Sequence, residues 1–361
     1  MRRHPRPRRA LRPVPRGAQP AGAGRPAGAP GTGRLHDNHP PHDHHHRGPR
    51  PVIAAPPGIS VVLPARDEGD RVGATIASAL DAATGPDGVE FVVVDDCSAP
   101  ERRPGVGDAA ARRRTTVIRS GRHLGVGAAR NLAARHARGR ILFVTDAHTR
   151  FSDGWDRAAT RLLAPGRILS VTIADSASAW RGHGCRLVVP YMGTRWNTAP
   201  PGPAPHVHVA SSAGTVVERA LFDRLGGYDE GMVHYGGFEP EFSVRAWRAG
   251  AEIAHTTDIE ITHRFKPREE VDSFVGAART AMVHNCLRFG TAHLPESMIL
   301  EMVRLHALEF PEHIRAALAL LEERGAWRRR EELAATLPHD FAWFVRRFGL
   351  LDQIGRPVPE K

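Results

Sequence analysis

A carboxylate and an imidazole stand two residues apart in Asp146-Ala147-His148, directly after the apolar run 141–145. A short apolar run that ends in an acid is typical of a buried parallel strand, which delivers the acid to the sheet edge where open α/β folds bind ligands. Both side chains can reach one divalent ion such as Mn²⁺. An isolated Asp-x-His is more often a polar strand end, so this interpretation depends on its surroundings.

Two other polar strand ends, taken alone, are weaker indications of a functional site. Asp95 and Asp96 follow the apolar run 91–94, and such a pair can bind ribose hydroxyls or the imide N–H of a uracil, although acids at this position often cap the next helix. His263 ends the alternating run 259–263 and could complete a metal site with the Asp-x-His residues. A lone histidine there is more often structural.

Two acids, Glu239 and Glu241, stand at the start of an expected helix. The helix macrodipole favours acids in a first turn, so simple capping is one explanation. The functional interpretation places Glu239 in the cleft as a catalytic base or acceptor-orienting group, with Glu241 supporting it.

The segment 125–131 nearly spells the dinucleotide-binding fingerprint, and Asp146 lies at a suitable distance downstream for a ribose-binding acid. We reject that interpretation because Arg130 replaces the third small residue and the glycines begin several residues after Arg119. Two strand–helix units also precede the segment. Glycines at a helix start still give a nucleotide room to approach, and Arg130 could neutralise phosphate or contact the base.

Alternating strands and helices position these side chains. We expect strands at 59–64, 91–96, 115–119, 141–146, 168–173, 214–217 and 259–263, and helices at 72–83, 126–137, 155–163, 218–225 and 239–249. This alternation indicates an α/β fold with a mostly parallel sheet covered by helices on both faces. Residues 176–208 lack a pattern and are expected to form a long functional loop. The chain is expected to be helical after His263, with stretches at 298–308 and 314–323.

The positive charge is concentrated at the N-terminus. Of the net charge of +11, the first 50 residues hold eleven arginines and two aspartates, which is 11 − 2 = +9. The remainder is nearly balanced, which argues against a nucleic-acid-binding face. Residues 1–57 have almost no large apolar side chains and are expected to be a disordered tail.

The cysteines and the hydropathy of the sequence indicate the cellular compartment of the protein. Cys97, Cys185 and Cys286 lack metal or redox spacing and are interpreted as reduced thiols of a cytoplasmic protein. No apolar run reaches the roughly 18 residues that a membrane span needs, and no signal peptide is recognisable. Peripheral membrane association is compatible with the sequence.

Together the motifs resemble family 2 glycosyltransferases with the GT-A fold, and most closely the catalytic domain of polypeptide N-acetylgalactosaminyltransferases. The shared segments, in the same order over residues 59–266, are 60–64, the Val-Asp-Asp-x-Ser of 94–98, the Asp-x-His of 146–148, Gly154-Trp155, and 235–247 with Ser243, Arg245 and Trp247 in register. A metal-binding histidine before a basic tail corresponds to His263. The resemblance implies a GT-A domain over 58–266, followed by a helical extension over 267–361.

Two departures from the family pattern matter. Phe238 replaces the first acid of the family's Trp-Gly-Gly-Glu-Asn segment, and Glu239 occupies its Asn position, which is also that of the catalytic Asp in inverting relatives. The stereochemical outcome therefore stays open. The absence of a lectin-like domain and of a membrane anchor argues against a secretory enzyme of the animal type.

The resemblance implies transfer of a sugar from a nucleotide-diphosphate donor, such as UDP-GlcNAc, UDP-GalNAc or a UDP-hexose. The acceptor would be a glycan, peptide or secondary metabolite. It implies Mn²⁺, with Mg²⁺ as the alternative, on Asp146, His148 and His263, while Trp180, Tyr191 and Trp196 could stack on the acceptor. The expected donor contacts are Pro64, Arg66, Asp67, Asp96, Arg130, Asp146 and Ala147.

Two other classes of protein are the alternatives. A nucleotidylyltransferase or NAD-binding oxidoreductase would need phosphate-binding glycines directly after the first strand, and residues 64–68 supply none. A catalytically inactive sugar-nucleotide-binding or scaffold protein is made conceivable by Phe238. Metal-dependent hydrolysis of a donor would exclude the inactive class.

Overall fold

The computed structural model describes residues 57–360. The tail predicted for residues 1–57 therefore lies, except for Pro57, outside the described residues. These described residues belong to one compact unit. No helix within 57–360 is long and apolar enough to cross a membrane.

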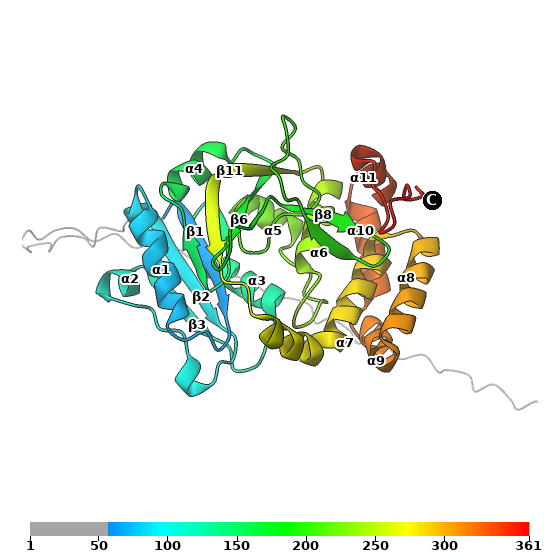
Figure 1. Ribbon diagram of the computed structural model, residues 1–361, viewed down its shortest axis with the longest axis horizontal. Coiled ribbons are helices and arrows are strands. Elements are labelled where there is room, and N and C mark those ends of the chain that lie inside the picture. Colours follow the sequence, from blue (N-terminus) through cyan, green and yellow to red (C-terminus); the bar gives the residue numbers. More distant parts are fainter. Residues whose placement is uncertain (1–56, 361) are drawn as a thin grey trace, which may run out of the picture. The chain divides into compact units, whose positions relative to one another are not determined.

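A mixed sheet forms the centre of this unit (Figure 1). The strands are β1 (Ile59–Ala65), β2 (Val89–Asp95), β3 (Thr115–Arg119), β4 (Ile141–Val144), β5 (Thr149–Phe151), β6 (Arg167–Asp175), β7 (Arg181–Gly182), β8 (Cys185–Val188), β9 (Gly193–Trp196), β10 (Thr215–Glu218) and β11 (Glu252–His263). Their order in the main sheet is β3-β2-β1-β4-β10-β6-β11-β5, with β7 on β6, while β8 and β9 pair separately.

The sheet is less parallel than predicted. Among the described residues, β1–β2, β1–β4, β2–β3 and β6–β11 are parallel, whereas β4–β10, β6–β10, β5–β11 and β6–β7 are antiparallel. An apolar run predicts a strand but not its direction, and β10 runs against both of its neighbours. The patternless loop predicted for 176–208 was also wrong in part, because it contains β7, β8 and β9.

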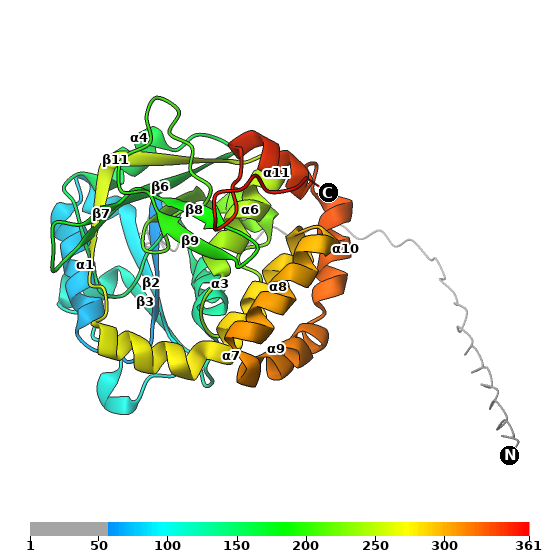
Figure 2. The same cartoon turned by 45° about the vertical axis from the view of Figure 1, so that its right-hand side comes forward.

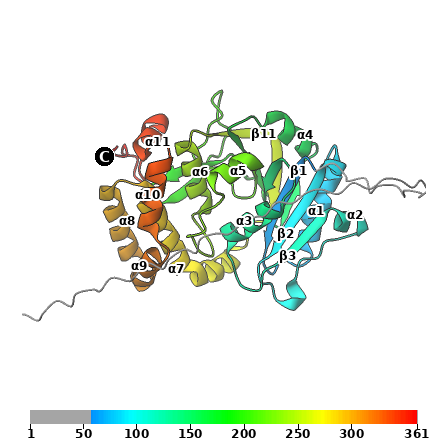
Figure 3. The same ribbon diagram turned by 180° about the vertical axis from the view of Figure 1, so that it is seen from behind.

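Helices cover both faces of the sheet. They are α1 (Arg71–Ala82), α2 (Ala109–Arg113), α3 (Val126–His136), α4 (Trp155–Leu162), α5 (Arg219–Leu225), α6 (Phe238–Arg248), α7 (Arg268–His293), α8 (Glu296–Glu309), α9 (Pro311–Glu323), α10 (Ala326–Thr336) and α11 (Phe341–Phe348). Figure 3 shows α3, α5 and α6 on the face opposite to that of Figure 1. The predicted helices and strands are confirmed to within a few residues at their ends, except that the strand predicted at 259–263 begins earlier, at Glu252.

Successive side chains of β1 point to opposite faces of the sheet, where two separate apolar clusters form the core. Val61 and Leu63 pack in one apolar cluster with Ile76 of α1 and Trp155 of α4. Val62 faces the other side of the sheet, in a cluster that includes α3, α5 and α6. This cluster continues into helices α7–α11, so the C-terminal helices share a core with the sheet. Figure 2 shows α7 leading from the sheet to α8–α11.

Candidate active site

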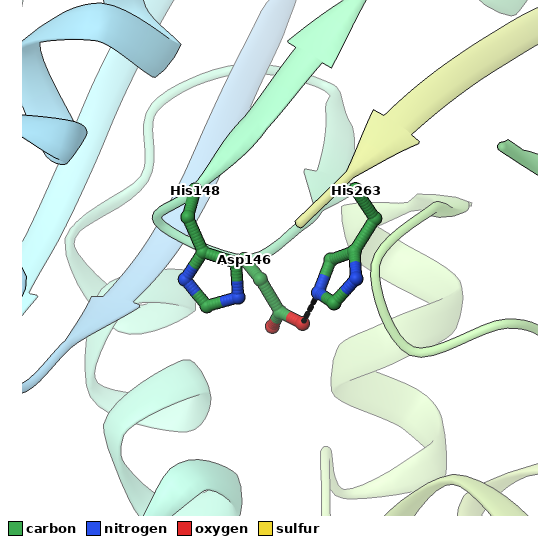
Figure 4. Close-up of side chains that lie close together, drawn as sticks. All are labelled: Asp146, His148 and His263. Atoms are coloured by element: carbon green, nitrogen blue, oxygen red, sulfur yellow. Dashed lines mark ion pairs between the residues drawn. The ribbon is translucent and has the colours of Figure 1, made fainter. Parts of the chain in front are cut away.

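Three strand segments bring Asp146, His148 and His263 together. Asp146 follows β4, His148 lies between β4 and β5, and His263 is the last residue of β11. The antiparallel register of β5 and β11 places His263 opposite Thr149, the neighbour of His148. One potential ligand atom from each of the three side chains lies within 4.8 Å of the others. Figure 4 shows the side chains converging on one point.

The chemistry of this cluster suits a divalent cation. Nε2 of His263 lies 3.4 Å from Oδ2 of Asp146. The Nδ1 atoms of both histidines are buried and make no hydrogen bond of good geometry within the described part of the chain. Nδ1 of His148 lies 3.3 Å from Oε2 of Glu68, which makes Glu68 its nearest polar neighbour of opposite charge. One carboxylate and two imidazoles in this arrangement could hold a metal ion.

Arg130 is the electrostatic centre of the site. Its side chain is 1 % exposed and lies 2.9 Å from Oδ1 of Asp146 and 2.6 Å from Oε1 of Glu239. Burial opposes the charge of Arg130, but the phenol of Tyr228 and these two acids outweigh it and raise the guanidinium pKa. Burial would likewise raise the pKa of Asp146, yet the hydrogen bond to His263 and the charge of Arg130 hold it well below its usual range. Arg130 thus holds both acids in place and helps to keep Asp146 ionised.

The structure separates the two acids of α6. Glu239 is 21 % exposed and points to Arg130. Glu241 is 0 % exposed, and both of its oxygens lie 2.7 Å from nitrogens of Arg245. Positions i and i+2 lie roughly 200° apart around a helix, so the two acids cannot face one cleft. The expectation of Glu241 as a catalytic residue is corrected: it supports α6 from inside.

Buried His293 predicts a pH dependence of stability. It lies 3.3 Å from Glu241 and accepts a hydrogen bond from Arg248, and burial lowers its pKa to about 4. Between this value and its unfolded pKa of about 6.5, the unfolded chain binds more protons, so stability falls as the pH drops. Acidification from pH 7 to pH 5 should cost about 2 kcal/mol through His293. Glu241, whose pKa is depressed further still, stays ionised throughout this window.

Denaturant unfolding of His293→Gln at both pH values checks this expectation. The variant should lose about 2 kcal/mol less than wild type on acidification. His313→Gln, at a partly exposed histidine of α9, serves as the control and should keep the full pH dependence. An unchanged pH dependence in His293→Gln would refute the assignment.

The expected donor residues lie at the ends of β1, β2 and β4. Ala65 pairs with Asp95, which places Pro64, Arg66 and Asp67 beside the end of β2. Arg66 and Asp67 are partly exposed, whereas Ala147 is buried beneath the cluster. Asp67 has a φ of 56°, a strained conformation for a non-glycine residue. Its carboxylate accepts a hydrogen bond from the amide of Ala99.

The carboxylate of Asp96 accepts hydrogen bonds from the backbone just before α3. Its two carboxylate oxygens accept the amides of Leu124 at 2.5 Å and Gly125 at 2.9 Å, and Nε2 of His123 lies 3.3 Å away. The side chain is almost fully buried. Asp96 therefore shapes the loop beside the donor edge, and His123 is the more exposed polar group there.

The glycines before Arg130 serve packing rather than phosphate binding. The amide of Val126 donates to the carbonyl of His234, so this amide and its two predecessors already have acceptors. A Cβ at Gly125 would lie 2.6 Å from Cα of His234, and one at Gly127 would overlap the ring of Phe238. The expectation that a nucleotide approaches this helix start is corrected. The dinucleotide-binding interpretation also loses its remaining support.

The contact between Gly127 and Phe238 gives a direct test. Although alanine is the better helix former by up to about 1 kcal/mol, Gly127→Ala should destabilise the protein by about 1–3 kcal/mol. Adding Phe238→Leu should recover part of this loss, because the two sites are in contact. Thermal or denaturant unfolding measures the cycle, with Gly121→Ala, which meets nothing within 4 Å, as control. Strictly additive effects would contradict the proposed overlap.

Aromatic side chains extend from the cluster toward the 176–208 segment. The ring of Phe265 lies 4.5 Å from that of His263 and 5.4 Å from that of Trp180, which in turn contacts Trp196 at 5.3 Å. Tyr191 instead stacks on His306. The structure thus brings Trp180 and Trp196 together but not Tyr191. Sequence reasoning missed Phe265, although its position two residues after His263 was a usable signal.

Two cavities of the described chain lie away from the Asp146 cluster. One of about 220 Å³ is lined by residues of 226–231 and 324–332 together with Arg288. The other, of about 240 Å³, lies among α6, α7, α10 and α11. Neither includes a residue of the Asp146 cluster.

Comparison with known proteins agrees with this geometry. Residues 60–180 match the model of glycosyl transferase family 2. Polypeptide N-acetylgalactosaminyltransferase 12 of Mus musculus is 26 % identical over 294 residues, covering 75 % of this chain and 48 % of that protein. Inactive polypeptide N-acetylgalactosaminyltransferase-like protein 5 of Macaca fascicularis is 24 % identical over 230 residues, covering 57 % and 50 %.

The fold has a solved counterpart in GalNAc-T7, crystallised with UDP, GalNAc and Mn²⁺. The TM-score is 0.60 at 19 % identity, covering 82 % of this chain and 57 % of that one. The chain thus has the GT-A fold and is similar to glycosyltransferases of the family 2 type, among them the polypeptide N-acetylgalactosaminyltransferases. It spans about half the length of the curated relatives it matches.

Proposed function

We propose that this protein transfers a sugar from a nucleotide-diphosphate donor to an acceptor hydroxyl or amine. The donor class is a UDP-sugar, such as UDP-GlcNAc, UDP-GalNAc or a UDP-hexose. The observation that carries the proposal is the convergence of Asp146, His148 and His263 at the carboxyl edge of a GT-A sheet. This edge is where open α/β sheets bind their ligands.

A divalent ion, Mn²⁺ or alternatively Mg²⁺, fits the cluster. Asp146, His148 and His263 would hold it, and one carboxylate with two imidazoles is a donor set that suits such an ion. When bound, the ion supplies a Lewis acid that stabilises the charge developing on the departing diphosphate. The ionised state of Asp146, which Arg130 and His263 maintain, keeps the carboxylate ready as a ligand.

The chain's own residues would hold and orient the donor. Pro64, Arg66 and Asp67 lie along one side of the edge, and Arg66 offers a cation to a phosphate. Asp96 holds the loop that carries His123, and this histidine would face the nucleobase of the donor. Arg130 is already committed to two acids, so its contribution to donor binding is the placement of Asp146 and Glu239.

Glu239 is the proposed base. Arg130 holds its Oε1, which leaves Oε2 to accept the proton of the attacking acceptor group. Phe238, which stands where relatives carry an acid, is buried and cannot take that role. A single carboxylate on the acceptor side favours direct displacement with inversion at the anomeric carbon. Phe265, Trp180 and Trp196 offer ring faces to the acceptor, whether a glycan, a peptide or a secondary metabolite.

Calorimetric titration of the full chain with UDP tests the proposed donor site. UDP should bind in the presence of Mn²⁺ and lose most of its affinity in EDTA. His263→Ala should behave like wild type in EDTA, whereas His313→Ala should behave like wild type with Mn²⁺. Equal UDP affinity with and without the metal would refute the metal site.

A second candidate is a sugar-nucleotide-binding protein without turnover. The loss of the family's acid at Phe238 favours it, and one of the similar proteins is itself named inactive. It predicts metal-dependent UDP binding with no donor cleavage. Release of UDP from any donor in a single turnover would exclude it.

A further inference from the structure

A cavity of about 240 Å³ lies between the ends of α6 and α7, the middle of α10 and the start of α11. Apolar side chains form most of its wall: Ala292, Leu294, Pro295, Ala334, Phe341 and Ala342. Arg248 and Arg330 line it as well. The cavity is separate from the Asp146 cluster and plays no part in the proposed transfer.

Arg248 is a buried cation with only neutral acceptors. Its side chain belongs to a residue that is 6 % exposed. Nε donates to the carbonyl of His339 at 3.0 Å, and Nη1 donates to Nδ1 of His293 at 2.9 Å. Within residues 57–360 no carboxylate oxygen lies within 4.0 Å of its nitrogens. Such a buried charge is costly without a counter-ion.

Arg330 adds a second cation without a carboxylate partner among the described residues. Its Nη1 donates to the carbonyls of Thr291 at 2.8 Å and Leu294 at 2.7 Å, which belong to the end of α7. Burial, together with the charge of Arg330, lowers the pKa of Arg248 to about 10, although Asp340 and Glu241 oppose the shift. The two guanidinium groups are thus close enough to repel each other.

The two carboxylates that line the cavity are engaged elsewhere. Asp340 accepts the amide of Trp343 and so caps the start of α11. Glu360 pairs with Arg346 at 2.8 Å. The pair Arg248 and Arg330 therefore lacks a direct counter-charge within the described chain, and an anion in the cavity would supply one.

We propose that this cavity binds a small organic carboxylate. The forked donors of two arginines match the two oxygens of a carboxylate, and the apolar wall suits a short hydrocarbon or aromatic body. The volume is below the roughly 300 Å³ at which pockets for drug-sized ligands begin, so the ligand is small. The inference goes beyond sugar transfer and does not depend on it.

The site lies on the helix that carries Glu239. Arg248 is the last residue of α6, and Glu239 stands in its first turn. His293 lies between Arg248 and Glu241, which is ion-paired with Arg245 of the same helix. A bound carboxylate would connect α6 to α10 through Arg330 and thereby brace the helix of the proposed base.

Calorimetry on the full chain tests the proposal with benzoate as the probe. Benzyl alcohol is the uncharged analogue, and inorganic phosphate is the anion without an apolar body. Arg330→Gln removes one cation, and Ala334→Leu fills the cavity without changing any charge. Arg328→Gln is the matched control, because Arg328 lies on the same helix but is highly exposed and outside the cavity.

Benzoate should bind at one site per chain, and benzyl alcohol should bind at least tenfold more weakly. Arg330→Gln should weaken benzoate binding about tenfold, Ala334→Leu should abolish it, and Arg328→Gln should leave it unchanged. No saturable binding of benzoate, equal binding of benzyl alcohol, or equal binding by Ala334→Leu would overturn the proposal. Tighter binding of phosphate than of benzoate would overturn the assignment to carboxylates.

Discussion

Replacing Asp146 or His148 with alanine is expected to abolish sugar transfer while the fold survives. Each variant removes one of the three side chains that converge at the sheet edge. Losing a fixed electrostatic stabiliser of the leaving group costs on the order of 10²–10³-fold in turnover, and loss of a metal ligand should cost at least as much. Steady-state turnover with the best donor measures the effect, and circular dichroism checks the fold.

The fold should persist because both side chains project from strand ends rather than from the core. Asp153→Ala and His136→Ala are suitable controls, since both residues are exposed and lie on neighbouring segments. They should retain wild-type turnover. Near-normal rates in Asp146→Ala or His148→Ala would remove these residues from the proposed metal site.

Glu239→Gln is expected to reduce transfer severely and to leave nucleotide binding intact. The amide keeps the size of the side chain and a carbonyl oxygen for Arg130, but it cannot accept the acceptor's proton. General-base catalysis contributes typically about 10²–10⁴-fold, so kcat should fall within that range. Transfer rates and UDP titrations of the same preparation separate the two effects.

Glu230→Gln provides the control for this substitution. Glu230 is an exposed acid that pairs with Arg135 at 2.9 Å and is not part of the proposed machinery. Its transfer rate should match wild type. If Glu239→Gln still transferred sugar at a rate close to wild type, Glu239 would not be the base.

The parts of the fold that depend on residues close together in the sequence could be predicted from it. The apolar composition of runs such as 59–65 and 141–144 predicts buried strands. The polar residues that follow these runs predict a site at the sheet edge. Asp146 and His148 were predicted together because a single turn holds both. His263 required one more inference, namely that a distant strand ends beside that turn.

The parts that depend on pairing partners and burial could not be predicted in the same way. The direction of β10 and the register of β5 with β11 arise between segments far apart in the chain. The engagement of Asp96 with the start of α3 is also non-local. Glu241 is different, since the helical repeat alone places it on the face opposite Glu239. Its inward orientation could have been predicted from the sequence.

Release of UDP from a panel of UDP-sugars, with Mn²⁺ and with EDTA, tests the central claim most directly. The full chain should hydrolyse one donor slowly in Mn²⁺ and none in EDTA, and that donor identifies the sugar. Asp146→Ala should release no UDP from the same donor. No UDP release across the panel, together with no binding of UDP in Mn²⁺, would contradict the assignment of this chain as a metal-dependent UDP-sugar transferase.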